Sequence, residues 1–189
     1  MYVGCCISIK VGDRMNISLN KRVKVTSGKN SEKEKILKSV RFILDKNSLF
    51  TISTLDVRTK NPCSSSAYYS FDDDLNLYFW TDPNAKHSKN IEKNSNVAVN
   101  IFDSHQAWGS LLKGVQMRGV ARVVTKKELL IGGALYLKRF PNVSQYVKKI
   151  LDFHSKKFQS KMYKIEPTWI KLFDEELFGK EGWREISFL

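Results

Sequence analysis

The chain has 189 residues, a formal net charge of +13, and 42% hydrophobic and 12% aromatic residues. This length suits one domain, or one domain with an appendage, and the apolar content allows a packed core, which excludes a wholly disordered chain. No apolar run approaches the roughly 20 residues of a membrane helix. The apolar first nine residues follow no charged segment, so we expect no signal peptide. The cysteines, Cys5, Cys6 and Cys63, show no CxxC spacing, which favours a reducing cytoplasm.

More than half of the excess positive charge lies near the N-terminus. Residues 1–41 hold ten Lys or Arg and three Asp or Glu, a net +7 of the total +13. This asymmetry predicts a basic, poorly ordered arm at residues 1–29, with a short strand as an option, and a folded domain at residues 30–189. Such an arm is either a solvated leader or a contact for nucleic acid or another anionic surface.

Three stretches carry helical patterns. Ser31 and Glu34 form an S-x-x-E capping box ahead of an apolar stripe that ends near residue 46, which predicts a helix there. Two more helices are predicted at residues 126–139 and 143–157, separated by Pro141. The pair Gly132-Gly133 is a weak point of the first of these two.

The remaining periodic stretches predict strands, at residues 49–54, 64–71, 77–81, 97–102, 114–124 and 161–174. The DDDLN turn joins the second and third as a hairpin. The apolar phase shifts at Gly119, which indicates a bulge or a barrel corner, and Pro167 interrupts the last strand. Mostly antiparallel strands with a few helices describe an α+β, barrel-like domain.

The link between the third and fourth strands is unusually basic. It reads NAKHSKNIEKN over residues 84–94, and Asp82 or Asn84 is a candidate cap for a short helix there. Lys86 and His87 would then lie in the first helical turn, where free N–H groups and the helix dipole favour a phosphate. Thr81 ends the preceding strand and adds a hydroxyl. The alternative is a solvated surface helix.

The order of these elements resembles a known family. LYFWTDPNAKHSKNIEKNSNVAVNIF is similar to the aromatic strand, phosphate turn, short helix and barrel strand of the FMN-binding split-barrel superfamily, typified by pyridoxamine 5'-phosphate oxidase. KGVQMRGVARVV, ALYLKRFPNV and IEPTWIKLFDEELFGKEGW resemble an uncharacterised bacterial branch, the YhbP-like proteins. The resemblance covers roughly residues 33–184 and implies an antiparallel, Greek-key-like split barrel with flanking helices.

The resemblance also implies a cofactor, FMN, bound between the two barrels of a homodimer. Site residues carried over from it lie in three groups. Near the phosphate it places Thr81, Lys86 and His87; along the flavin ring and ribityl chain, Ser65, Ala67 and Ser70; and from the second protomer, Lys113, Gly114 and Gln116. Ser65 and Ser70 stand where the oxidases carry Arg and Lys, so fewer fixed cations point at the phosphate.

Three functions stay open at this level. The first is a flavin-dependent oxidoreductase of unknown substrate, for which the sequence names no catalytic residue. The second is a flavin or haem binding module, acting as a sensor or carrier without turnover, and the third is a nucleic-acid-binding protein using the basic arm. His87, His105 and His154 show no HExxH spacing, so we expect no metal site.

Overall fold

The computed structural model describes residues 23–145, 160–180 and 182–189. Its strands are β1 (Val23–Ser27), β2 (Leu49–Leu55), β3 (Pro62–Phe71), β4 (Leu77–Thr81), β5 (Asn96–Phe102), β6 (Lys113–Val123), β7 (Lys161–Asp174) and β8 (Trp183–Phe188). Its helices are α1 (Lys33–Lys46), α2 (Lys86–Lys93), α3 (Lys126–Arg139) and α4 (Glu175–Phe178), with 3-10 turns at Asn30–Glu32 and Pro141–Gln145.

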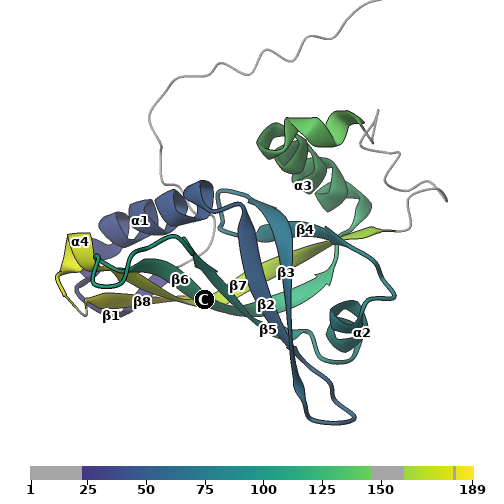
Figure 1. Ribbon diagram of the computed structural model, residues 1–189, viewed down its shortest axis with the longest axis horizontal. Helices are drawn as coiled ribbons and strands as arrows, with labels where there is room; N and C mark the ends of the chain where they lie inside the picture. The colour runs from purple at the N-terminus through teal and green to yellow at the C-terminus, as the bar shows by residue number, and fades with distance from the viewer. Residues whose placement is uncertain (1–22, 146–159, 181) are drawn as a thin grey trace, which may run out of the picture.

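These strands form one antiparallel sheet in the order β1-β8-β7-β4-β3-β2-β5-β6. An additional pairing of β6 with β7 joins the sheet to itself, so the six strands from β7 to β6 close into a barrel. The strands β8 and β1 extend the sheet outward from β7 (Figure 1). The predicted α+β antiparallel barrel with flanking helices is therefore confirmed.

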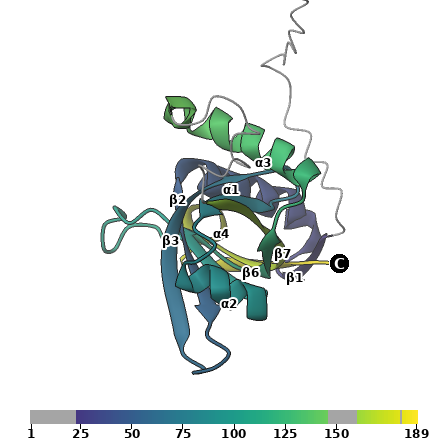
Figure 2. The same cartoon turned by 90° about the vertical axis from the view of Figure 1, so that its right-hand side faces the viewer.

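Alternating side chains of the barrel strands fill one continuous core, in which Phe50, Ile52, Tyr69 and Phe79 are at most 1% exposed. The apolar stripe of α1 packs into the same core through Ile36, Leu37, Val40, Ile43 and Leu44. Figures 1 and 2 show α1 on a different side of the barrel from α2, and α3 over β4. The barrel is therefore packed with side chains, and ligand sites must lie at its ends or on its outer surface.

The predicted irregularity at Gly119 is confirmed. The register of β6 against β7 shifts between Arg118 and Gly119, and Thr168 is the unpaired residue of β7. A Cβ on Gly119 would lie 2.5 Å from the carbonyl oxygen of Glu166. Pro167 does not interrupt the strand as predicted, because the bulge accommodates it and β7 runs through all 14 residues.

The predicted cap of the first helix is wrong in its residues. The helix α1 begins at Lys33 after a 3-10 turn, and the carboxylate of Glu32 accepts the backbone N–H of Lys29 at 2.8 Å. Glu34 instead forms an ion pair with Lys38 at 2.9 Å. A competing local hydrogen bond two residues earlier thus replaces the Ser31–Glu34 box.

The glycine pair in α3 does not break that helix. Gly132 is buried, and a Cβ there would lie 2.5 Å from the ring of Tyr78 and 2.8 Å from the sulfur of Met162. The missing side chain lets α3 approach β4 closely, so this glycine serves packing.

Two predicted segments fall wholly or partly outside the described residues. The predicted arm at 1–29 is described only from Val23, where β1 pairs with β8, and its boundary at residue 30 stays a prediction. The predicted helix at 143–157 is described only to Gln145, within the 3-10 turn. Among the described helices, none has both the length and the apolarity that a membrane crossing requires.

Replacing Gly119 with alanine should lower the free energy of unfolding by about 1–3 kcal/mol, since the added methyl group meets a backbone oxygen that cannot rotate away. Chemical denaturation measures the change. The neighbouring, exposed Val120→Ala is the control and should change stability far less. Equal stability of Gly119→Ala and the wild type would show that the bulge does not need glycine.

Candidate functional site

The basic link predicted from the sequence forms a corner where β4 ends and α2 begins. Asp82 accepts the backbone N–H of Asn84 at 2.8 Å in a tight turn, and α2 starts at Lys86 with Ala85 as its N-cap. The predicted cap, Asp82 or Asn84, is therefore wrong. Alanine supplies no capping oxygen, so the N-cap residue leaves the first-turn N–H groups of α2 without a side-chain cap.

His87 lies in this corner next to the strand end. Its Nε2 is 2.6 Å from Oγ1 of Thr81. Partial burial lowers the pKa of the imidazole below its ordinary value, which favours the neutral ring near pH 7. The pair thus presents a hydroxyl and a neutral ring, both able to donate or accept a hydrogen bond.

Lys86 supplies the positive charge of the corner. Its ammonium donates to Oδ2 of Asp56, which follows β2. The other oxygen of Asp56 accepts the backbone N–H groups of Arg58 at 3.0 Å and Thr59 at 3.3 Å. Lys86 and these N–H groups hold the pKa of the Asp56 carboxyl well below its usual range, so a negative charge is fixed beside the lysine.

Polar side chains attach α2 to the barrel. Ser88 donates to the carbonyl oxygen of Asp82 at 2.7 Å, and the amide of Asn90 donates to Oγ1 of Thr54 on β2 at 3.0 Å. The side chains of Ser88, Asn90 and Thr54 are buried. The corner therefore sits on a rigid support, and sequence reasoning identified none of these supporting residues.

The strand β3 separates the three predicted flavin contacts into two sets. Ser65 and Ala67 pair with Ile52 and Phe50 of β2, both core residues, so they face the barrel interior. Ser70, an odd number of residues away, faces outward beneath α3. The helix α2 packs on β2 and β3.

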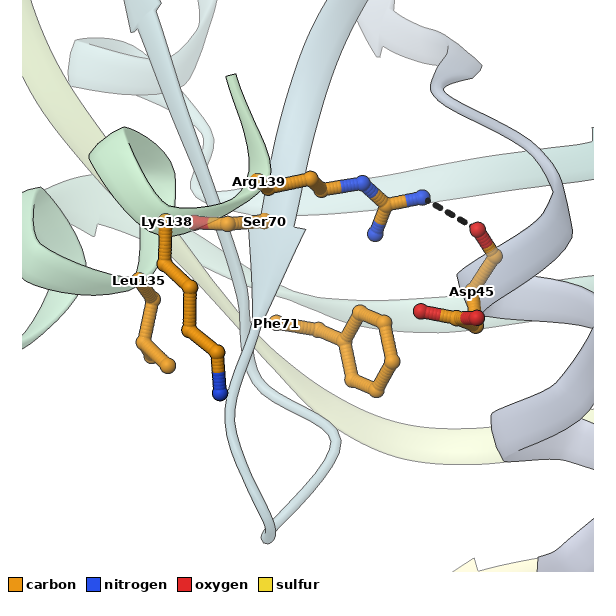
Figure 3. Close-up of a pocket in the computed structure, with 6 residues that line it drawn as sticks. All are labelled: Asp45, Ser70, Phe71, Leu135, Lys138 and Arg139. Atoms are coloured by element: carbon orange, nitrogen blue, oxygen red, sulfur yellow. Dashed lines mark hydrogen bonds between the residues drawn. The ribbon is translucent and has the colours of Figure 1, made fainter. Parts of the chain in front are cut away.

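Ser70 lines a pocket of about 250 Å³ between α3, β3 and the end of α1 (Figure 3). Nη2 of Arg139 donates to the carbonyl oxygens of Leu44 and Asn47, both at 2.7 Å, and thereby caps α1. The hydroxyl of Ser70 and Nη1 of Arg139 are buried without a hydrogen-bond partner among the described residues. Buried donors of this kind ordinarily contact a water or a ligand.

The third predicted group lies on β6 and is remote from the corner within one chain. Gln116 pairs with Lys171 on β7, whereas Thr81 pairs with Lys161, ten residues earlier. That separation is about 30 Å along the strand. Lys113 is held elsewhere, by an ion pair with Glu176. The structure therefore joins Thr81 to His87, and Lys86 precedes His87 in α2 while bonding to Asp56. Lys113, Gly114 and Gln116 lie away from this corner within one chain.

Gln116 belongs to an open sheet face. Strand pairing aligns one outward row, Ser66, Thr51, Asn100, Gln116 and Lys171, and a second, Ser64, Ser53, Ala98, Arg118 and Trp169. These two rows contain no carboxylate. In Figure 2 no described helix lies over the outer surface of β2 and β3. We call these ten residues the open face.

The fold and this corner define a split-barrel protein with a candidate phosphate site. The chain belongs to the pyridoxamine 5'-phosphate oxidase family, whose model matches residues 36–174. The finer assignment to the YhbP-like branch stays a prediction. No match was found among curated proteins.

Solved structures share the fold at low identity. A protein of unknown function from Agrobacterium tumefaciens is 16% identical with a TM-score of 0.59, over 74% of this chain and 56% of that one. A heme binding protein from Mycobacterium smegmatis is 16% identical with a TM-score of 0.63, over 81% and 57%. A heme storage protein from Vibrio cholerae is 15% identical with a TM-score of 0.50, over 70% and 89%. This chain thus spans little more than half of the first two proteins.

The partial burial of His87 leads to a prediction about the pKa of its imidazole. Its imidazole should titrate below the ordinary value of 6.5, because the half-buried ring loses hydration when it becomes charged. Two-dimensional NMR of the ring protons against pH measures the midpoint, assigned by comparison with His87→Asn. A midpoint at or above 6.5 would show that the ring is solvated or paired with an anion.

Proposed function

We propose that this protein binds FMN through the Thr81–Lys86–His87 corner and acts as a flavin-dependent oxidoreductase. One observation carries the proposal: the helix α2 starts without a side-chain cap at Ala85, its first residue is Lys86, and the imidazole of His87 is hydrogen-bonded to the hydroxyl of Thr81. A phosphate monoester carries up to two negative charges and several acceptor oxygens. Directed N–H and O–H donors beside a cation are the groups that such an anion requires.

The residues present fit a phosphate, with a weaker charge than an arginine-lined site would supply. Lys86 is the cation of the Thr81–Lys86–His87 corner, Asp56 offsets part of its charge, and His87 is mainly neutral near pH 7. Binding would therefore depend on the one proton that the bonded Thr81–His87 pair leaves free and on the first N–H groups of α2 as much as on net charge. We expect moderate FMN affinity for this reason.

In this proposal the flavin supplies the electron or hydride chemistry, and the protein binds and orients it. Ser65 and Ala67 face the packed barrel interior, so they are not assigned a contact with the ribityl chain. The pocket at Ser70 and Arg139 is a candidate place for a substrate, because its unpartnered donors face a small cavity. The substrate itself stays open.

A homodimer belongs to the same proposal. Gln116 is about 30 Å along β7 from the corner, so it can approach a flavin held there only from a second copy. The open face supports such an assembly: it lacks carboxylates, and the residues at its centre on β2 and β5, Thr51, Ser53, Asn100 and Ala98, are uncharged, with Arg118 and Lys171 toward one edge. Depletion of charge at the centre of a face is typical of interfaces.

Two other functions are weighed against this one. A haem binding module has support in the heme-binding neighbours, but their likeness extends to the fold only. Nε2 of His87, a candidate iron ligand, is already hydrogen-bonded to Thr81.

A flavin carrier without turnover would be yellow, but nicotinamide cofactors would not reduce its flavin. Nucleic-acid binding through residues 1–29 would weaken steeply with salt and vanish when that arm is deleted. A cytoplasmic location stays a prediction.

Replacing Lys86 with alanine should weaken FMN binding by about 1.5–3 kcal/mol, the scale of a charge-assisted hydrogen bond. Quenching of flavin fluorescence during titration measures the dissociation constant. Lys93→Ala, at the exposed end of the same helix, is the matched control and should bind FMN like the wild type. Equal FMN affinity of Lys86→Ala and the wild type would remove Lys86 from the site.

Replacing Asn100 with arginine should convert the dimer to monomers, since a two-fold axis through the open face would bring added like charges together. Light scattering after size exclusion gives the mass. Ala134→Arg, which adds the same charge on the exposed surface of α3, should leave a dimer intact. A wild-type mass of one chain, or a dimeric Asn100→Arg, would place the interface elsewhere or remove it.

A further inference from the structure

We propose that Asp56 sets how tightly the corner holds a phosphate, because its carboxylate competes with the phosphate for the Lys86 ammonium. This inference rests on the proposed function and assigns a specificity role to a residue that the sequence did not single out. It predicts that Asp56 lowers the affinity for a ligand with a phosphate, such as FMN, and leaves the affinity for a ligand without one, such as riboflavin, unchanged. The riboflavin portion of FMN should not be affected by it.

The side chain of Asp56 is held more firmly than that of Lys86. The Asp56 side chain is 10% exposed, and its Oδ1 is held by the backbone N–H groups of Arg58 and Thr59. Its own backbone N–H donates to the carbonyl oxygen of Asn61 at 3.0 Å, which fixes the β2–β3 turn. The Lys86 side chain is 57% exposed, on a flexible four-carbon stem. A ligand can therefore move Lys86, but it cannot displace Asp56.

The charge of this pair is balanced before any ligand arrives. Oδ2 of Asp56 accepts from the lysine, so a phosphate must share that ammonium with a fixed carboxylate. The Asp56 carboxylate and the phosphate would repel each other when both contact the Lys86 ammonium. Because Lys86 is exposed to solvent, water and salt screen this repulsion and keep it moderate. The arrangement lowers the affinity for a phosphate without blocking it.

The same hairpin turn could have been capped without this effect. An asparagine at position 56 would still offer an oxygen to the N–H groups of Arg58 and Thr59 while carrying no charge. Asp72 shows the comparison within this chain: its Oδ1 caps the β3–β4 turn through the N–H groups of Asp74 and Asn76, and no lysine among the described residues is bonded to it. Charge and turn capping can therefore be separated by experiment.

The test compares Asp56→Asn with the wild type, using FMN and riboflavin as the two probes. The dissociation constant for FMN should fall about tenfold, a low estimate for one nearby charge at a partly exposed site. The constant for riboflavin should stay within about twofold, because riboflavin has no phosphate. Asp72→Asn, which removes one charge from the next hairpin turn, should change neither constant.

Each other result counts against the inference. Unchanged FMN binding in Asp56→Asn would overturn it, and weaker FMN binding would show that Asp56 positions Lys86 for the phosphate instead. If Asp72→Asn gained as much FMN affinity as Asp56→Asn, the effect would come from the net charge of the protein and not from the contact of Asp56 with Lys86. If no protein in the set binds FMN, the proposed function fails and the inference fails with it. Should Asp56→Asn not fold, Asp56→Ser replaces it, since a hydroxyl can cap the same turn.

Discussion

The pairing of β6 with β7 closes the barrel, and the positions of all candidate site residues depend on that closure. The strand β7 pairs with β4, β6 and β8, so it lies between the strand that ends in Thr81 and the strand that carries Gln116. The bulge at Gly119 and Thr168 is the local adjustment that makes this pairing possible around Pro167. Closure fills the interior with side chains and directs ligand binding to the outside.

On the closed barrel, the corner between β4 and α2 combines firmly held side chains with one exposed side chain. Asn90 and Ser88 hold α2 to the barrel, and Thr81 and His87 are bonded to each other. Lys86 is the exposed element, and its charge is balanced by a carboxylate from the neighbouring hairpin. In the proposal, this corner binds a phosphate by directed hydrogen bonds, and Asp56 lowers the affinity for it.

The sequence predicted the elements well where local signals act alone. The strand β4 has the predicted limits, because an aromatic run lies between two polar turns. The caps of α1 and α2 were misplaced, since several neighbouring polar residues can each serve. Strand alternation alone would have shown that Ser65 and Ser70, five residues apart, face opposite sides. The contact of Asp56 with Lys86 was not predictable, because it depends on how α2 docks on the closed barrel.

The most direct test of the phosphate corner is a crystal structure of the protein soaked with FMN. The proposal predicts density for the phosphate within hydrogen-bond distance of Oγ1 of Thr81 and the Lys86 ammonium, with α2 unmoved and the isoalloxazine ring near a second copy of the chain. A bound flavin with its phosphate elsewhere, or crystals grown with excess FMN in which this corner stays empty, would contradict it.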